Sequence, residues 1–303
     1  MSTAVILKSR HIQGTSNGPH LLITGGVHGD EFEPMAAVRR LLETLSSEQL
    51  AGSVTLVPVV NEAAFLAGQR TAEDGLDLAR VCPGKSDGSV TERTAHALSE
   101  HIRTADYYID LHTGGSAYSV LPLVGYSLHE NAEVLGQQRE MARAFGLPII
   151  WGTSSHPGRS LSVAYEANIP ALYAEYLGGG DCSQAGIDAY VNGCLNVMGC
   201  LNMIDRRPRP AETDVIEVED NRPGSGHMQV QNPSPQTGFF VPRVTLGMAV
   251  EPGDEIGRVR GVLGEPNAVV ESTQSGIVLV LRVFRRVFKG ESVGVILENS
   301  ASQ

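Results

Sequence analysis

The sequence contains few aromatic residues and few lysines. Phe, Trp and Tyr make up 5% of its 303 residues, and only three of its 23 basic residues are lysines. The formal net charge is −11, because 34 acidic residues outnumber the 23 basic ones. A chain with so few stacking side chains and so little positive charge lacks both features of a nucleic-acid surface. We therefore expect a small-molecule substrate and no nucleic-acid partner.

The chain also lacks a long hydrophobic run. Its longest apolar stretch, 277–283, is interrupted by Arg282. That stretch is far shorter than the roughly 18 residues of a membrane-spanning helix. Residues 1–10 lack the charged start, apolar middle and small-residue cleavage site of a secretion signal. We expect no membrane partner.

Cysteine is scarce, and none of the four cysteines belongs to a CxxC pair. In a chain of this length, Cys82, Cys182, Cys194 and Cys200 are most simply reduced thiols. This pattern indicates a cytoplasmic protein.

Hydrophobic residues make up 42% of the chain, which suffices for one large domain or two ordinary ones. Up to about Asp205, short apolar runs alternate with longer helical patterns. The expected strands are 20–24, 53–60, 106–111, 119–125, 147–151 and 170–176, and the expected helices are 32–45, 91–103, 131–145 and 187–204. This alternation predicts a mixed, mainly parallel α/β sheet with helices on both faces. Active sites in such sheets lie at the carboxyl ends of the strands.

After Asp205 the pattern changes to short strands separated by Gly and Pro. The segment 206–211 is a plausible boundary between an α/β domain of residues 1–205 and an all-β module of residues 206–303. Within that module, 237–254 resembles 275–291, although turn residues can also agree by chance. We expect two similar halves in one small barrel or sandwich.

A glycine-rich motif, GGVHGDE, follows the first expected strand. Its His28 and Glu31 could bind one metal ion through an imidazole nitrogen and a carboxylate oxygen. The pair alone is a weak pattern, since a glutamate at a helix start is also favoured by the helix dipole. His112 ends another strand, in DLHTGG, and Asp110 points to the same side of that strand. Together His28, Glu31 and His112 predict a zinc site with one open position.

Hydrolysis at such a site needs a general base. Glu175 is the best candidate, because it is a lone carboxylate in an apolar strand where burial would raise its pKa. The alternative is an edge-strand glutamate that faces water. Arg70 and Arg80 lie in 61–84, which lacks clean periodicity and is expected to be a long ordered loop. Each could polarise a carbonyl or bind a carboxylate, or could form a surface ion pair.

The motifs as a set resemble one known family. GGVHGDE, NxxAFxxGxR, DGxDLxRxxPG, DLHTGG and a late Glu followed by Gly are similar to those of the succinylglutamate desuccinylase/aspartoacylase family of zinc carboxypeptidase-like hydrolases. The order and spacing match over about residues 20–180. The C-terminal β module also resembles that of the family.

This resemblance implies a role for each matching residue. It implies one Zn²⁺ per subunit, held by His28, Glu31 and His112, with Glu175 as general base on zinc-bound water. Arg70 would help to polarise the scissile carbonyl. For substrate binding we name Arg80, which would hold the substrate carboxylate, together with Asn61 and Arg159.

One position departs from the family pattern. The family usually has Asn before the carboxylate-binding Arg, as D-x-N-R, whereas this chain has Ala79. Because Ala offers no side-chain hydrogen bond, carboxylate recognition must be weaker, rearranged or supplied elsewhere. Arg159 could compensate. Cys82, where the family often has Phe, is expected to be a packing change.

The C-terminal module is similar to the barrel that carries biotin or lipoate in other proteins. Such carriers need a lysine on an exposed hairpin, and the stretch 258–275 between the two halves contains none. We therefore expect a scaffold, a lid or an oligomer contact.

The resemblance implies a zinc-dependent amidohydrolase of the deacylase type that removes a short acyl group from an N-acyl amino acid. The alternatives are a metallocarboxypeptidase acting on short peptides and a non-catalytic zinc-binding scaffold. Bacterial deacetylases of N-acetyl-diaminobutyrate are similar in layout, and the acidic residues Glu73, Asp74 and Asp77 would suit a cationic substrate or form a solvated loop. Other divalent ions also fit a His–His–carboxylate set. We also allow for a homo-oligomer.

Overall fold

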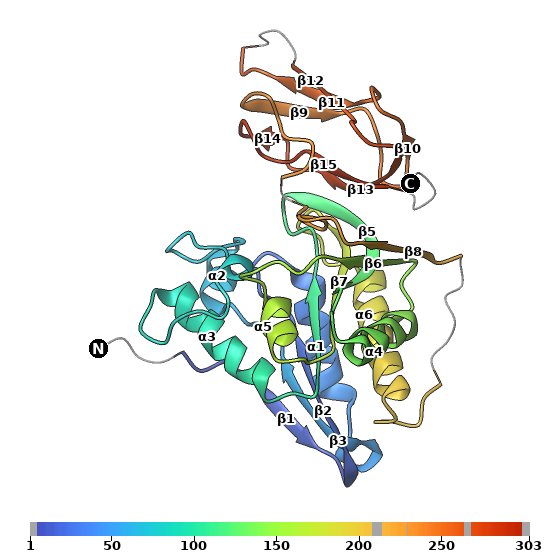
Figure 1. Cartoon of the computed structure of the whole chain (residues 1–303). Coiled ribbons are helices and arrows are strands. Elements are labelled where there is room, and N and C mark those ends of the chain that lie inside the picture. Colours follow the sequence, from blue (N-terminus) through green and yellow to red (C-terminus); the bar gives the residue numbers. More distant parts are fainter. Residues whose placement is uncertain (1–4, 208–213, 229, 264–267, 299–303) are drawn as a thin grey trace.

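The computed structural model describes residues 5–207, 214–228, 230–263 and 268–298, and within them 11 strands form one large sheet (Figure 1). The path of the sheet is β1-β3-β2-β4-β7-β5-β13-β10, with β6 between β5 and β8, and with β15 beside β13. These strands are β1 (Arg10–Gln13), β2 (Ser16–Thr24), β3 (Ala51–Val57), β4 (Tyr107–His112), β5 (Tyr118–Ser127), β6 (Ile149–Thr153), β7 (Ala171–Gly178), β8 (Ile216–Asp220), β10 (Ala249–Val250), β13 (Gly276–Arg282) and β15 (Gly294–Glu298).

The centre of this sheet is parallel. Strands β3, β2, β4 and β7 run in one direction, and β5, β6 and β8 form a second parallel group that is antiparallel to β7. The helices are α1 (Phe32–Thr44), α2 (Glu62–Ala67), α3 (Val90–Arg103), α4 (Ala132–Phe145), α5 (Ser160–Glu166) and α6 (Gln184–Cys200), with short 3₁₀ helices η1 (Ser47–Gln49) and η2 (Leu78–Arg80). The expected mixed, mainly parallel sheet with helices is confirmed.

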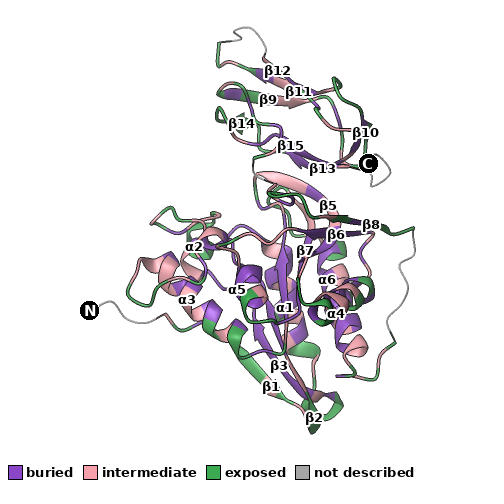
Figure 2. Ribbon diagram, viewed as in Figure 1, coloured by how far each residue is buried: buried purple, intermediate pink, exposed green. Residues whose placement is uncertain are grey.

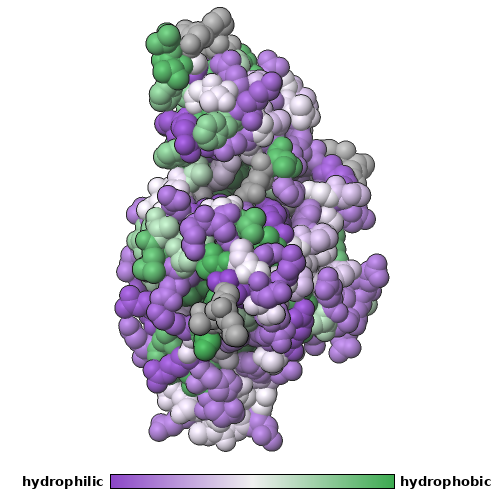
Figure 3. All heavy atoms as spheres, turned by 90° about the vertical axis from the view of Figure 1, so that its left-hand side faces the viewer, coloured by the Kyte–Doolittle hydropathy of each residue, from purple (hydrophilic) through white to green (hydrophobic). Residues whose placement is uncertain are grey.

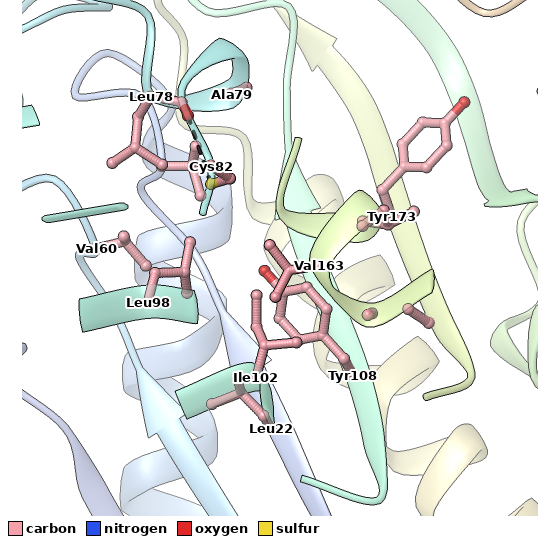
Figure 4. Close-up of a cluster of buried hydrophobic side chains, with 14 of the residues drawn as sticks. Leu22, Val60, Leu78, Ala79, Cys82, Leu98, Ile102, Tyr108, Val163 and Tyr173 are labelled. Atoms are coloured by element: carbon pink, nitrogen blue, oxygen red, sulfur yellow. Dashed lines mark hydrogen bonds between the residues drawn. The ribbon is translucent and has the colours of Figure 1, made fainter. Parts of the chain in front are cut away.

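Buried side chains cover the sheet on two sides. On one side Val38 of α1, Met141 of α4 and Val197 of α6 belong to one hydrophobic cluster with the strands. On the other side Leu98 of α3 and Val163 of α5 belong to a second cluster, part of which is drawn in Figure 4. Figure 2 shows mostly buried central strands, and helices in which buried residues alternate with intermediate and exposed ones. The helices therefore lie on both faces, as the alternation of the sequence predicts.

The short helices were not expected from the sequence. The segment 61–84, expected to be a loop, contains α2 and η2, and α5 follows β6. α2 begins where the Asn61 side chain accepts a hydrogen bond from the Ala64 N–H, and it ends at Gly68, which has a φ of 63°. Helices of six or seven residues are too short to show a helical period in sequence.

The C-terminal strands are joined to the large sheet. β13 pairs with β5 through Val280 and Val120, and β8 pairs with β6. The second sheet has the order β12-β11-β9-β14 and is formed by β9 (Gly238–Pro242), β11 (Glu255–Arg260), β12 (Ala268–Glu271) and β14 (Arg286–Val287). The expected division at residue 205 therefore does not coincide with a break between sheets, and it stays a prediction. Part of the expected boundary segment, 208–211, lies outside the described residues.

The two similar segments of the C-terminal module exchange partners. β9, from the first segment, pairs with β14 from the second, whereas β10 from the first pairs with β13 from the second. Phe240 and Val259 of the smaller sheet share a hydrophobic cluster with Val278 and Ile296 of the larger one. Figure 3 shows this narrow module above a wider lower part, with hydrophilic residues over most of that face. The second sheet gives the module two layers around a core of its own.

Two further features concern the whole described chain. Within it, no helix has both the length and the apolar character needed to cross a membrane. All four cysteines carry free thiols.

Candidate functional site

His28 and Glu31 lie on the loop that connects the carboxyl end of β2 to α1. Both are buried, with exposed fractions of 3% and 1%. The Nδ1 atom of His28 is 2.7 Å from Oε1 of Glu31. Glu31 occupies the N-cap position of α1, but its side chain makes no capping hydrogen bond. Its carboxylate faces the histidines instead, so Glu31 is not simply a helix-start glutamate.

His112 brings a second imidazole to the same carboxylate. It is the last residue of β4, and its Nδ1 atom lies 3.0 Å from Oε2 of Glu31. One ligand atom from each of His28, Glu31 and His112 lies within 4.8 Å of the other two. Two imidazoles and one carboxylate, buried and converging, are a donor set that zinc accepts in catalytic sites. The residues predicted as ligands are thus together, and their chemistry fits the metal.

A second buried carboxylate contacts the other ring nitrogen of His112. Asp110 Oδ2 lies 3.1 Å from Nε2 of His112, on the side of the ring away from Glu31. Thr24 donates a hydrogen bond of 2.8 Å to Asp110 Oδ1, and the Ser160 hydroxyl donates to Oδ2. Although burial lowers it, Asp110 and Glu31 hold the pKa of His112 well above its ordinary value. This second carboxylate fixes the orientation of the ring, as outer carboxylates do in metal sites.

Asp77 connects the cluster to Arg70. The Nε and Nη2 atoms of Arg70 donate hydrogen bonds of 3.1 and 3.0 Å to Asp77 Oδ2. Asp77 Oδ1 lies 3.2 Å from Nε2 of His28 and accepts a bond of 2.9 Å from the Ala79 N–H. Arg70 Nη1 in turn lies 3.7 Å from Oε1 of Glu31. Arg70 is therefore fixed beside the predicted ligands. The sequence predicts no site role for Asp77 beyond an acidic loop, although its place in the DGxDLxR motif is a signal.

Glu175 lies beside His112 on the neighbouring strand. The two residues are register partners where β4 and β7 pair in parallel. Strand β7 runs between β4 and β5, so the alternative of an edge strand is wrong. Glu175 is 7% exposed, and its Oε2 atom has no hydrogen-bond partner in the described part of the chain. Burial raises the pKa of Glu175 to about 7. A carboxylate with such a pKa can take up and release protons near neutral pH.

One cavity joins these residues to two further arginines. Its lining includes Ala79, Arg80, Arg159 and Tyr173 as well as the predicted ligands, Arg70 and Glu175. Arg80 Nη1 donates to the Ala79 carbonyl at 2.7 Å, and Arg159 Nη2 donates to the Gly226 carbonyl at 3.0 Å. Burial, and the nearby positive charge of Arg159, lower the pKa of Arg80. The cavity therefore has a strongly positive wall.

Asn61 lies apart from the other predicted residues. It is fully buried at the start of α2, where its Oδ1 atom accepts a bond of 3.2 Å from the Ala64 N–H. It is not among the residues that line the cavity. Its substrate-binding role stays a prediction, whereas its capping role is a feature of the structure.

Gly29 allows the histidine loop to lie directly on α2. A Cβ atom at this position would be 2.1 Å from the backbone carbon of Ala64. We expect Gly29→Ala to lower the free energy of unfolding by about 1–3 kcal/mol, because backbone must move to relieve the overlap. Gly136 in α4 is the matched control, since nothing lies within 4 Å of its Cβ position. Gly136→Ala should stabilise the protein by up to about 1 kcal/mol through helix propensity. Urea unfolding of both variants tests this, and equal stabilities would contradict it.

Comparison with known proteins identifies the family. The model of the succinylglutamate desuccinylase/aspartoacylase catalytic domain matches residues 17–201. This chain belongs to the succinylglutamate desuccinylase/aspartoacylase family. The matched range contains every residue predicted for the site.

Similar members of the family extend the match beyond the catalytic domain. The chain is 32% identical to an N-alpha-acetyl-L-2,4-diaminobutyric acid deacetylase from Halomonas elongata over 295 residues, which is 93% of this chain and 82% of the relative. A family member from Rhodobacter sphaeroides has a crystal structure with a TM-score of 0.88 and 26% identity, covering 97% of this chain and 89% of that one. The product-bound ectoine utilization protein EutE (DoeB) from Ruegeria pomeroyi has a TM-score of 0.85 and 26% identity, with 95% and 87% covered. The C-terminal module is thus part of the shared fold.

Proposed function

We propose that this protein is a zinc-dependent amidohydrolase that removes a short acyl group from an N-acyl amino acid. The observation that carries the proposal is the convergence of His28, Glu31 and His112 beside the buried Glu175. The similarity to a deacetylase along 93% of the chain supports the same reaction class.

His28, Glu31 and His112 would hold one zinc ion per subunit. When bound there, zinc would supply a Lewis acid, which favours deprotonation of water and polarises a carbonyl oxygen. Asp110 would keep the His112 ring in the orientation that presents Nδ1 to the site.

The side chains around the ligands carry the remaining steps. Glu175 takes a proton from the attacking water and returns it to the leaving amine. Arg70, held by Asp77, places a positive charge where the amide oxygen becomes negative. Arg80 binds the carboxylate of the substrate, and Arg159 adds a second guanidinium on the same cavity.

The C-terminal module has a supporting role in this proposal. Met228 and Val280 line the cavity, and the Gly226 carbonyl holds Arg159. We assign residues 206–303 to a small barrel-like scaffold that closes one side of the cavity and carries no covalent cofactor. The free thiols fit a cytoplasmic protein.

Amine release by the zinc-loaded protein tests the function. The panel contains N-acetyl, N-succinyl and N-formyl amino acids, N-acetyl-L-2,4-diaminobutyrate and short peptides, with Glu175→Gln as the blank. Release from one acyl amino acid, absent in the blank, is the expected result. Release from peptides alone would make the protein a metallocarboxypeptidase. No release, with zinc bound, would favour the scaffold alternative.

A further inference from the structure

Tyr173 is a polar residue of the cavity to which the sequence motifs assign no role. It lies on β7 two residues before Glu175, so both side chains are on the same face of the strand. Tyr173 is 7% exposed, belongs to a buried hydrophobic cluster and is one of the residues that line the cavity. In Figure 4 this hydroxyl points away from the other labelled side chains. The residue therefore belongs to the hydrophobic cluster, while its polar end is directed away from the other labelled members of that cluster.

The hydroxyl of Tyr173 has no hydrogen-bond partner among the described residues, although it is buried. A buried polar group without a partner costs about 1–3 kcal/mol, so native proteins rarely retain one. Phe would fill the same space without this cost. A hydrogen bond to a bound molecule would explain why this position carries a hydroxyl.

The backbone makes room for this ring at one position. Gly125 of β5 is the register partner of Tyr173. A Cβ atom on Gly125 would lie 2.3 Å from a ring carbon of Tyr173 and 2.5 Å from its hydroxyl oxygen. Only glycine therefore lets the phenol lie across β5 toward the cavity.

The charges nearby indicate what the phenol binds. Arg159 lines the same cavity, and no carboxylate of the described chain forms a salt bridge with it. A half-buried guanidinium of this kind is stabilised by an anion. A neutral phenol donates one O–H, and a carboxylate oxygen accepts such a bond strongly. A carboxylate bound in this cavity would offer an acceptor to the phenol and a negative charge to the guanidinium.

We propose that Tyr173 is a substrate-binding residue whose phenol donates a hydrogen bond to the carboxylate of the N-acyl amino acid. This inference rests on the proposed deacylase function and names the group that the cavity recognises. The phenol would add a hydrogen-bond donor to a cavity in which the Ala79 side chain supplies none.

Calorimetric titration separates this inference from the function itself. Each acyl amino acid of the panel is titrated into zinc-loaded Glu175→Gln protein and into the Glu175→Gln/Tyr173→Phe double variant. We expect Tyr173→Phe to weaken binding about 10- to 100-fold, as for a hydrogen bond to a charged group. For the primary carboxamide of the best-bound compound, Tyr173→Phe should weaken binding much less than it does for the acid. Equal affinities in the two proteins, equal losses for acid and amide, or no binding to either protein would overturn the proposal.

Turnover and stability complete the test. In an otherwise wild-type protein, Tyr173→Phe should raise KM about tenfold or more and change kcat less than about threefold, while unfolding stability stays equal or rises. A fall in kcat at unchanged KM would place Tyr173 on the reacting carbonyl and overturn the assignment. Binding that depends on Tyr173 without any amine release would refute the function but not the inference.

Tyr126→Phe is the matched control for a structural hydroxyl. The Tyr126 hydroxyl is bonded to Glu219 Oε1 at 2.7 Å, and the residue does not line the cavity. This variant should lose stability at unchanged KM, which is the reverse of the pattern expected for Tyr173→Phe. The same pattern in both variants would show that Tyr173 is structural.

Discussion

The Glu175→Gln variant is expected to bind zinc like the wild type and to lose about 10²–10⁴-fold in kcat, the usual contribution of a general base. Gln has nearly the same shape but cannot accept a proton. The carboxylate lies beside His112, and its Oε2 atom has no partner elsewhere in the described residues, so the substitution breaks no hydrogen bond of that atom. The measurements are kcat on the best substrate of the panel and metal content by atomic emission.

Glu33→Gln provides the matched control. Glu33 is also buried, also has one oxygen without a partner in the described chain, and does not line the cavity. Its activity should stay within a few-fold of wild type. If Glu175→Gln retained activity at the level of Glu33→Gln, the assigned base would be wrong.

The pH profile gives a second readout of the same residue. Only the deprotonated Glu175 can act as a base, and burial raises its pKa to about 7. The activity of the wild type should therefore be full above this pKa and fall as the pH decreases through it. A bound cation would shift this acid limb to lower pH, because positive charge favours the carboxylate. The residual activity of Glu175→Gln should lack the limb, and an identical limb in both proteins would contradict the assignment.

Glu31→Gln is expected to lose both the metal and the activity. The Glu31 carboxylate contacts His28 and His112 through its two oxygens, and the charges of these histidines hold its pKa far below the usual range despite burial. An amide at this position supplies one weak oxygen ligand and no charge. Outer residues of metal sites already cost about 10–100-fold when changed, so a ligand should cost more than about 100-fold. Metal affinity by competition with a chelator measures the effect.

Asp110→Asn distinguishes the role of a metal ligand from that of a residue that orients a ligand. Asp110 touches His112 Nε2 but is not one of the clustered ligand atoms. Asp110→Asn should reduce the affinity for zinc about 10–100-fold. At saturating zinc the activity of this variant should be close to that of the wild type. Glu31→Gln should not be rescued by added zinc. Stoichiometric zinc and full activity in Glu31→Gln would show that the metal is held elsewhere.

Local patterns in the sequence predict most of the elements, and they place His28 and His112 at the ends of strands. Hydrophobic periodicity is a local property, so the long helices and the buried strands could be read from neighbouring residues. The glycine-rich motifs then placed the predicted ligands at strand ends, where parallel sheets bring side chains together. Short helices such as α2 and α5 left no period to detect.

Which of these residues come together depends on contacts between distant segments of the chain. Glu175 acquires its raised pKa because β7 lies next to β4, and this pairing joins segments that are distant in the chain. Asp77 is part of the site because its segment lies against His28 and Arg70. In the sequence Tyr173 looks like one more residue of an apolar strand. Only the structure shows that its ring lies against Gly125 of β5. Strand pairing and burial depend on contacts between remote segments, which no local pattern contains.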